Sequence, residues 1–297
     1  MPSPRATFLF AAPDQPGLVA RIAGFFYERG FNIVDASNHT DVHAETAPRF
    51  FMRIVVDLAA LGVAGAGEAM GGSASRRTLE DSFGKIVLAL GGTWSVGYDD
   101  VVPNVAILVT KESACLYDLI LRQRQGELRC EIRIVISNHP TLESVADNFR
   151  IPFYALPVKP ETKADQERQI IELLKRHHID LVVLARYMQI VSADFLRAAP
   201  PAINIHHGFL PAFQGARPYH QAYARGVKLI GATAHYATVD LDQGPILEQD
   251  VARVDHGMGP EDLVRVGRDV ERLVLSRAVR AHLERRVIVE GNRTIVL

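Results

Sequence analysis

The residues best suited to chemistry lie in the second half of the chain, in the stretch INIHHGFLPAFQGARPYH that begins at Ile203. Asn204 and His206 are two positions apart in this stretch, just after a predicted apolar strand. Residues i and i+2 of an extended strand point to the same side, so an amide and an imidazole would face one space. Asn-x-His occurs by chance in many chains, so this spacing alone is a weak signal.

A second stretch, TVDLDQGPI, supplies carboxylates and a glycine. It places Asp240, Asp242 and Gly244 in a loop between two predicted strands. Glycine permits a close backbone approach, and a carboxylate on a loop held between two strands can be placed firmly beside His206. Water that attacks a carbonyl needs a group to take its proton and donors to hold the new oxyanion. An amide, an imidazole and a carboxylate would suit such chemistry, although an Asp in a loop is usually a turn residue.

The chain around these stretches alternates between strands and helices. Continuous apolar strands are predicted at Val105–Val109, Ile132–Ile136 and Leu181–Ala185, and the stretches between them have helical periodicity. This pattern is typical of a Rossmann-like α/β fold, in which a mostly parallel sheet is covered by helices on both faces. Open parallel sheets bind ligands beyond the carboxyl ends of their strands, and we expect Asn204 and His206 to lie there.

The first hundred residues follow a different order: strand, helix, strand, strand, helix, strand. In the first predicted helix, LVARIAGFFYERG, the apolar residues recur at helical spacing and a glycine ends the pattern. A run rich in Gly, Ala and Ser between Ala59 and Ser75 lacks bulky residues, so we expect a surface loop there. The change of pattern predicts two α/β domains, residues 1–100 and 101–297.

Composition and charge exclude several classes of protein. Of the 297 residues, 48% are hydrophobic and 23% charged, as in a globular protein with a large core. The formal net charge of −1 provides no basic field for nucleic acid or an anionic membrane. The N-terminal apolar run is broken by Pro13, Asp14 and Pro16, unlike a signal peptide or a membrane span. We therefore expect a cytoplasmic enzyme without nucleic-acid or membrane partners.

The second domain strongly resembles the catalytic domain of formyltetrahydrofolate deformylases, which are related to glycinamide ribonucleotide formyltransferase and methionyl-tRNA formyltransferase. The matching runs are SNHP, VLARYMQIVS, INIHHGFLPAFQGARPYHQAY, IGATAHY, DLDQGPILEQDV and GRDVERLVL. The family's catalytic set is an asparagine, a histidine two residues on, and an aspartate before a glycine-containing turn. These map onto Asn204, His206 and Asp242. One departure is Gly208, where the family usually has serine.

The resemblance implies hydrolysis of 10-formyltetrahydrofolate to formate and tetrahydrofolate, with no metal and no cofactor. Asp242 would orient a water molecule and take its proton, directly or through His206. Asn204 and a protonated His206 would stabilise the oxyanion. The family places part of the pterin slot on one segment, and the implied substrate-binding residues are Arg186, Met188, Gln189, Ile190, Val191, His207 and Gly244. Judged from the residues alone, Met188 and Ile190 could instead end a core strand.

The loop after the first strand of this domain distinguishes water from a nucleotide as the formyl acceptor. Ribonucleotide-using relatives carry a glycine-rich loop there, which holds the phosphate. This chain has LVTKESACLYD, residues 108–118, with no glycine, and a backbone cradle for phosphate needs the conformational freedom of glycine. We therefore expect water as the acceptor, with formyl transfer to an amine as the alternative.

The first domain resembles an ACT domain, a ferredoxin-like βαββαβ unit that usually binds a free amino acid at a dimer interface. The supporting run is PDQPGLVARIAGFFYERGFNIVDASNH. Its Asp14, Gly17 and Leu18 lead into a helix N-terminus, which suits a carboxylate ligand. We expect glycine or methionine as the effector and a homo-oligomer, with a purely dimerising domain as the alternative. Pro48 stands where these deformylases commonly have glycine.

Two other functions compete with this interpretation. The eleven histidines could serve a metal-dependent hydrolase, but the chain has no HExxH motif and no paired-cysteine spacing, and adjacent histidines in a strand point to opposite faces. A non-catalytic amino-acid sensor would need only the first domain, and the intact Asn204, His206 and Asp242 count against it.

Overall fold

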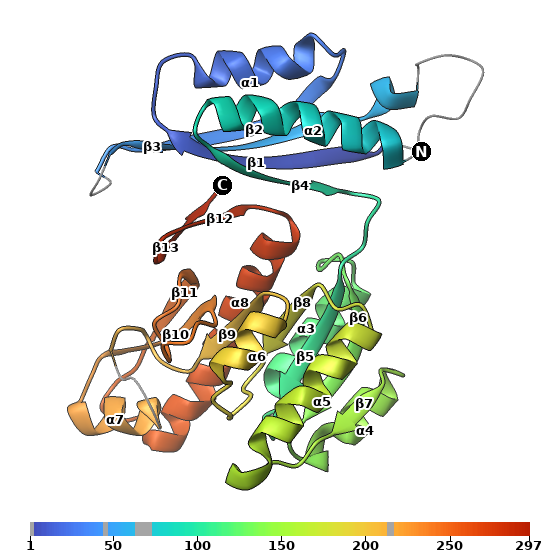
Figure 1. Ribbon diagram of the computed structural model, residues 1–297. Coiled ribbons are helices and arrows are strands. Elements are labelled where there is room, and N and C mark those ends of the chain that lie inside the picture. Colours follow the sequence, from blue (N-terminus) through green and yellow to red (C-terminus); the bar gives the residue numbers. More distant parts are fainter. Residues whose placement is uncertain (1–2, 44–46, 63–72, 213–216) are drawn as a thin grey trace. The chain divides into compact units, whose positions relative to one another are not determined.

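The computed structural model describes residues 3–43, 47–62, 73–212 and 217–297, and the chain divides into two compact units (Figure 1). Unit 1 comprises Met1–Val101 together with Arg285–Ile288 and Ile295–Leu297. Unit 2 comprises Val102–Glu284 and Val289–Thr294. No helix of the described residues is both long and apolar enough to cross a membrane.

Unit 1 is a four-stranded antiparallel sheet with two helices. The strands lie in the order β2-β3-β1-β4, and every neighbouring pair is antiparallel. This is the βαββαβ arrangement that the sequence predicts, and its elements are β1 (Arg5–Pro13), α1 (Leu18–Tyr27), β2 (Asn32–Asp41), β3 (Arg49–Asp57), a 3-10 turn (Ala59–Gly62), α2 (Ser73–Ala89) and β4 (Thr93–Tyr98).

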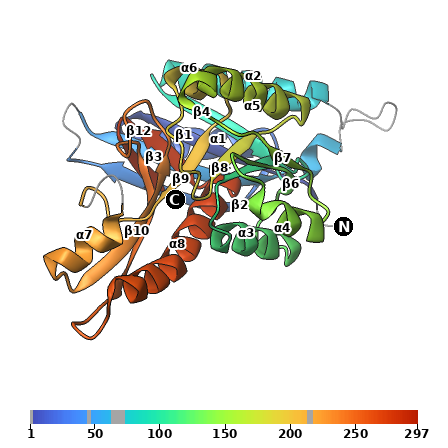
Figure 2. The same cartoon turned by 90° about the horizontal axis from the view of Figure 1, so that it is seen from below.

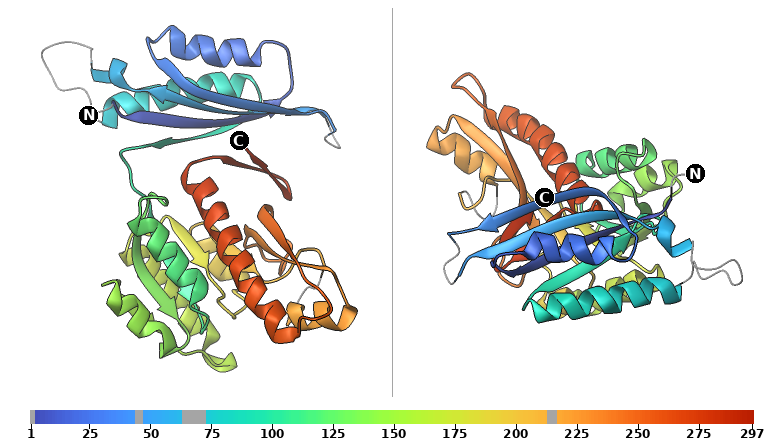
Figure 3. Two further views of the ribbon diagram at one scale, coloured as in Figure 1. Left: turned by 180° about the vertical axis from the view of Figure 1, so that it is seen from behind. Right: turned by 90° about the horizontal axis from the view of Figure 1, so that it is seen from above.

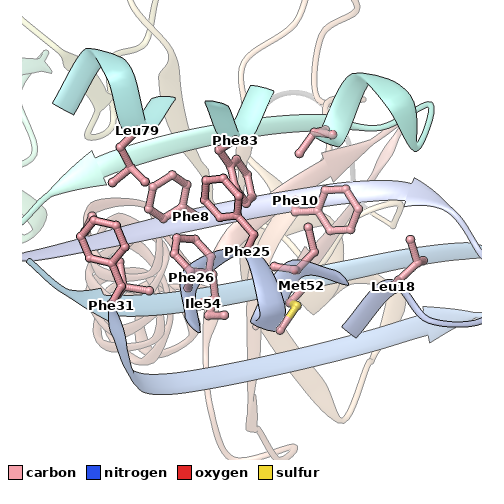
Figure 4. Close-up of a cluster of buried hydrophobic side chains, with 14 of the residues drawn as sticks. Phe8, Phe10, Leu18, Phe25, Phe26, Phe31, Met52, Ile54, Leu79 and Phe83 are labelled. Carbon is pink, nitrogen blue, oxygen red and sulfur yellow. The ribbon is translucent and has the colours of Figure 1, made fainter. Parts of the chain in front are cut away.

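The core of unit 1 lies between its sheet and its two helices. The apolar residues of α1 face the strands, and the side chains of Phe8, Phe25, Phe26 and Phe83 form one aromatic cluster (Figure 4). Seen from above, both helices lie on the same side of the strands (Figure 3). Within the run expected to be a loop, helix α2 already begins at Ser73, and residues 63–72 lie outside the described residues.

Unit 2 contains a seven-stranded sheet in the order β11-β10-β9-β8-β5-β6-β7. The strands from β9 to β7 are parallel to one another, whereas β10 and β11 are antiparallel to their neighbours. The strands are β5 (Asn104–Val109), β6 (Glu131–Ser137), β7 (Phe153–Ala155), β8 (Leu181–Leu184), β9 (Ala202–His206), β10 (Leu229–Tyr236) and β11 (Ile246–Arg253), and a two-stranded ribbon, β12 (Val287–Glu290) and β13 (Arg293–Val296), ends the chain.

Helices cover both faces of this sheet, as expected for buried parallel strands (Figure 2). Helices α5 and α6 pack on one face through a core that includes Ile170 and Phe195, and α3 and α8 lie together on the other. The helices are α3 (Ala114–Arg124), α4 (Glu143–Asn148), α5 (Lys163–Arg176), α6 (Ala193–Ala198), α7 (Pro218–Arg225) and α8 (Pro260–Leu283), with 3-10 turns at Pro140–Leu142 and Pro160–Thr162.

The strand order creates a topological switch point next to β5. The chain runs outward from β5 through β6 to β7 on one side, and then crosses back to β8 and β9 on the other side of β5. Ligands of open α/β sheets bind beyond the carboxyl ends of the strands at such a point. A ligand site is therefore expected among the residues that follow β5, β8 and β9.

Candidate active site

Asn204 and His206 project from β9, and Asp242 lies in the loop between β10 and β11. His206 Nδ1 is 3.3 Å from Asp242 Oδ2, and the two side chains are only 4% and 9% exposed. Because a carboxylate oxygen only accepts, Nδ1 carries the ring proton. His206 Nε2 is buried and has no hydrogen-bond partner among the described residues. The imidazole is thus fixed by Asp242 on one side and free to react on the other.

His235 is a fourth member of the site, and no motif in the sequence had marked it as one. The antiparallel register of β9 and β10 pairs it with Asn204, so both side chains lie on one face of the sheet. His235 Nδ1 donates to the carbonyl oxygen of Tyr236 at 2.9 Å. In neutral His235 the lone pair is therefore on Nε2, which lies 3.2 Å from Asn204 Nδ2. This contact directs the Asn204 NH2 group and leaves its second N–H for a ligand.

Asp242 is ionised and accepts a hydrogen bond from His206. Its second carboxylate oxygen, Oδ1, is 3.7 Å from His235 Nε2. The hydrogen bond from His206, and then the contact with His235, hold the pKa of Asp242 well below its usual range, although burial opposes the effect. The residue has a φ of +58°, a left-handed conformation that aspartate tolerates better than most residues. This conformation aims the carboxylate at the two histidines.

The Asp242 loop requires glycine at position 244. A Cβ at Gly244 would lie 1.8 Å from the carbonyl oxygen of Tyr236. Any other residue at this position would therefore require the backbone to shift. The backbone of Tyr236 also donates to Pro245 at 3.0 Å. Asp240, by contrast, is exposed, and its carbonyl oxygen accepts from Thr238 Oγ1. The two aspartates of this loop therefore have different roles, and only Asp242 faces the histidines.

The turn after His206 is held by Thr233. This residue lies on β10, pairs with His206 on the neighbouring strand β9, and is fully buried. Its hydroxyl donates to the carbonyl oxygen of Gly208 at 2.9 Å and accepts from the backbone of Leu210 at 3.0 Å. Gln249 donates to the same hydroxyl and to the Leu210 carbonyl. Because position 208 bonds through its carbonyl, glycine in place of the family's serine leaves this network intact.

His207 differs from its catalytic neighbour. Its ring centroid is 5.5 Å from that of His206 and 6.2 Å from that of Tyr219. Burial, assisted by the nearby charges of Arg186 and His206, lowers the pKa of His207 to about 3. His207 therefore stays neutral near neutral pH and takes no part in proton transfer there.

The segment from Arg186 to Val191 is a loop rather than the end of a core strand. Strand β8 ends at Leu184, and the side chains of Met188 and Ile190 are 52% and 60% exposed, whereas Gln189 is only partly exposed. The backbone N–H of Met188 donates to Thr110 Oγ1 at 2.9 Å. The alternative in which these two residues end a core strand was wrong.

The predicted effector residues lie at the start of α1 in unit 1. Gly17 caps the helix with a φ of +89°, and a Cβ at this position would meet no atom of the described residues within 4 Å. Leu18 is buried in the core, so only its backbone can face a ligand. Asp14 is exposed and donates its backbone N–H to the carbonyl oxygen of Pro48 at 2.9 Å. Proline lacks a backbone N–H but keeps its carbonyl oxygen, so Pro48 can accept this hydrogen bond.

Histidine, cysteine and acidic side chains form no group of three or more that could hold a metal ion, within the residues that the structure describes. Cys115 and Cys130 are both buried and free.

Comparisons with known proteins match both units. The formyl transferase family model matches residues 103–279, and the ACT domain model matches residues 6–63. A formyltetrahydrofolate deformylase of Synechocystis is 49% identical over 98% of each chain. The crystal structure of a formyltetrahydrofolate deformylase from Pseudomonas syringae pv. tomato is 41% identical, with a TM-score of 0.90 over 99% of this chain and 95% of that one. A glycinamide ribonucleotide transformylase from Symbiobacterium toebii is 29% identical, with a TM-score of 0.64 over 67% of this chain and 96% of that one.

Proposed function

Because the chain belongs to the formyltetrahydrofolate deformylases, which join an ACT domain to a formyl transferase domain, we propose that Asn204, His206 and Asp242 form its hydrolytic centre. The protein is a hydrolase that converts 10-formyltetrahydrofolate to formate and tetrahydrofolate. The observation that carries the proposal is the His206–Asp242 contact, because it leaves a buried Nε2 free on the face of β9 that also carries Asn204.

The proton path runs through His206. Both oxygens of Asp242 already face histidines, and its lowered pKa makes the carboxylate a weak base. His206 Nε2 takes the proton of the attacking water, and Asp242 stabilises the imidazolium that forms. As the bond from carbon to N10 breaks, the same Nε2 returns the proton to the departing nitrogen. Water is thus added and tetrahydrofolate leaves as a neutral amine.

The oxyanion is held by Asn204. One N–H of its amide is engaged by His235 Nε2, so the other is directed without rotation of the side chain. A donor that is preorganised in this way stabilises charge in the transition state without a cost of reorientation. His235 is therefore a positioning residue in the proposal, and it acts through Asn204 rather than on the substrate.

The folate is proposed to lie along the loop after β8. The exposed side chains of Met188 and Ile190 offer apolar surface to the pterin. Gln189 and Val191 offer backbone groups to its edge, and His207 and Gly244 complete the proposed substrate-binding set. The hydroxyl of Thr110 fixes the backbone of this loop through Met188.

Water, rather than a nucleotide, is the acceptor that the loop after β5 favours. Its residues include Glu112, which forms an ion pair with Arg268 at 3.2 Å. This carboxylate would compete with a phosphate for the Arg268 guanidinium, and the loop contains no glycine to build a backbone cradle. Transfer to an amine is the alternative function.

The ACT domain is proposed to bind glycine or methionine at the N-terminus of α1, through the backbone of Gly17 and Leu18 near Asp14. We also propose a homo-oligomer in the cytoplasm that uses neither a metal nor a cofactor.

The test is turnover of the full-length protein with 10-formyltetrahydrofolate. Formate and tetrahydrofolate should appear one for one, and a chelator should leave the rate unchanged. A rate abolished by the chelator would revive the metal-dependent alternative, and absence of formate would contradict the proposal.

A further inference from the structure

A second group of buried ionisable side chains lies beside the catalytic centre. Arg186 from the loop after β8, Tyr219 from α7 and Glu271 from α8 meet in the interior of unit 2. Tyr219 donates its hydroxyl to Glu271 Oε1 at 2.7 Å, and Arg186 Nε lies 3.5 Å from Glu271 Oε2. Glu271 and Tyr219 are only 2% and 4% exposed. We refer to these three residues as the Arg186 cluster.

The Arg186 cluster is costly to bury. Arg186 has a φ of +62°, which is unusual for a residue other than glycine. Its Nε and Nη1 atoms are buried and have no hydrogen-bond partner among the described residues. Burial raises the pKa of Glu271. Buried ion pairs contribute little net stability compared with apolar side chains of similar size, so stability alone does not account for the cluster.

The cluster fills the space between the catalytic histidines and the loop after β5. At one end, the ring of Tyr219 lies against His207, the neighbour of His206. At the other end lies buried Cys115, at the start of α3. Burial raises the pKa of its thiol, and the charges of Glu271 and then Arg186 are near enough to affect this pKa as well. Packing between these ends is tight, because a Cβ at Gly267 would lie 2.1 Å from Tyr219 Cζ.

Transfer of the formyl group to an amine and its hydrolysis by water would proceed by the same bond changes. An amine that attacks the formyl carbon forms a bond from its nitrogen to that carbon, the bond to N10 breaks, and the amine proton passes to N10. Apart from the nucleophile, this sequence is the same as hydrolysis, so the same catalytic residues would serve both reactions. The choice between them rests on which nucleophile reaches the carbon, and a water molecule needs far less room than an amine with its substituents.

We propose that the Arg186 cluster is a specificity element, which excludes amine acceptors by occupying their approach and so makes water the only nucleophile. The inference rests on the proposed hydrolytic centre. It assigns to the side chains of Arg186 and Glu271 a role that is separate from folate binding by the backbone of the loop.

The test measures how products partition when the full-length enzyme turns over 10-formyltetrahydrofolate in the presence of glycinamide, a small primary amine. Formylglycinamide, formate and tetrahydrofolate are quantified by mass spectrometry. The wild type should yield formate only. Arg186→Gly suits the positive φ and removes the side chain, and Arg186→Gly with Glu271→Ala removes both charges. Either variant should yield formylglycinamide per tetrahydrofolate on the order of tenfold or more above the detection limit at which the wild type yields none, since small steric changes in a pocket are worth this much.

Arg186→Met is the matched control, because it keeps most of the side-chain volume without the charge. It should yield formate only. Variants with Arg186→Gly that turn over but produce formate alone would overturn the proposal, as would amine transfer by the wild type or by Arg186→Met. Loss of all turnover in both glycine variants would also overturn it, because the cluster would then serve hydrolysis itself. Failure of the hydrolytic centre is distinguishable, since it would appear in the wild type as absence of formate.

Discussion

Replacing His207 with glutamine should make the native protein less sensitive to acid. The pKa of His207 falls from the ordinary value of 6.5 to about 3, with burial as the largest cause. Between these two values the unfolded chain binds a proton at this residue that the folded chain refuses, so stability falls as the pH falls. From pH 7 to pH 5, linkage gives a loss of about 2 kcal/mol in the free energy of unfolding from this residue alone.

Denaturant titrations of the wild type and His207→Gln at pH 7 and pH 5 measure this term as a difference of differences. The loss on acidification should be about 2 kcal/mol smaller in the variant, because contributions of the other groups cancel. Circular dichroism follows both units, whereas Trp94, the single tryptophan, lies in unit 1 and provides an internal control. An equal loss in both proteins would refute the claim that His207 is held neutral.

Three further predictions concern residues that support the two sites. Gly244→Ala should lower both turnover and melting temperature, since its Cβ would lie 1.8 Å from a backbone oxygen; normal turnover would show that the loop can move aside. Thr110→Val leaves the Met188 N–H without an acceptor, which costs about 1–3 kcal/mol, so KM for folate should rise more than kcat falls, and Thr110→Ser should restore it. Gly17→Val disfavours the φ of +89° and crowds the helix N-terminus, so calorimetry with glycine and methionine should show weaker binding to the full-length variant. If neither amino acid binds the wild type or changes its turnover, only the dimerising role survives.

The full-length chain is required for that last experiment. Residues Arg285–Ile288 and Ile295–Leu297 belong to the same compact unit as the N-terminal strands. A fragment that ends at Asp100 would lack them, and its failure to bind an amino acid would be uninformative.

The features that could be predicted from sequence are those set by local pattern. Apolar periodicity predicts helix α1 of unit 1 and strands β5, β6 and β8 of unit 2, and the i, i+2 spacing of Asn204 and His206 predicts that they share a face. Helix α2 is the main local exception. It begins at Ser73, earlier than its apolar periodicity indicates, because the first turns carry few apolar residues to reveal it.

Long-range features of the site could not be predicted in this way. His235 joins Asn204 only through the register of two antiparallel strands, and register depends on tertiary pairing. The choice between Asp240 and Asp242 required the family resemblance, since both stand in the same turn-rich loop. The Arg186–Glu271 ion pair joins residues far apart in the sequence, and no spacing rule connects them.

The measurement that tests the hydrolytic centre most directly is the turnover of Asp242→Asn against Asp240→Asn. The amide oxygen of the first variant can still accept from His206, so folate binding should be kept. Loss of the charge that stabilises the His206 imidazolium should lower kcat by about 10²–10⁴-fold. The second variant changes an exposed neighbour in the same loop and should turn over like the wild type. Near-normal turnover of Asp242→Asn, or equal losses in the two variants, would contradict the assignment of Asn204, His206 and Asp242 as the catalytic residues.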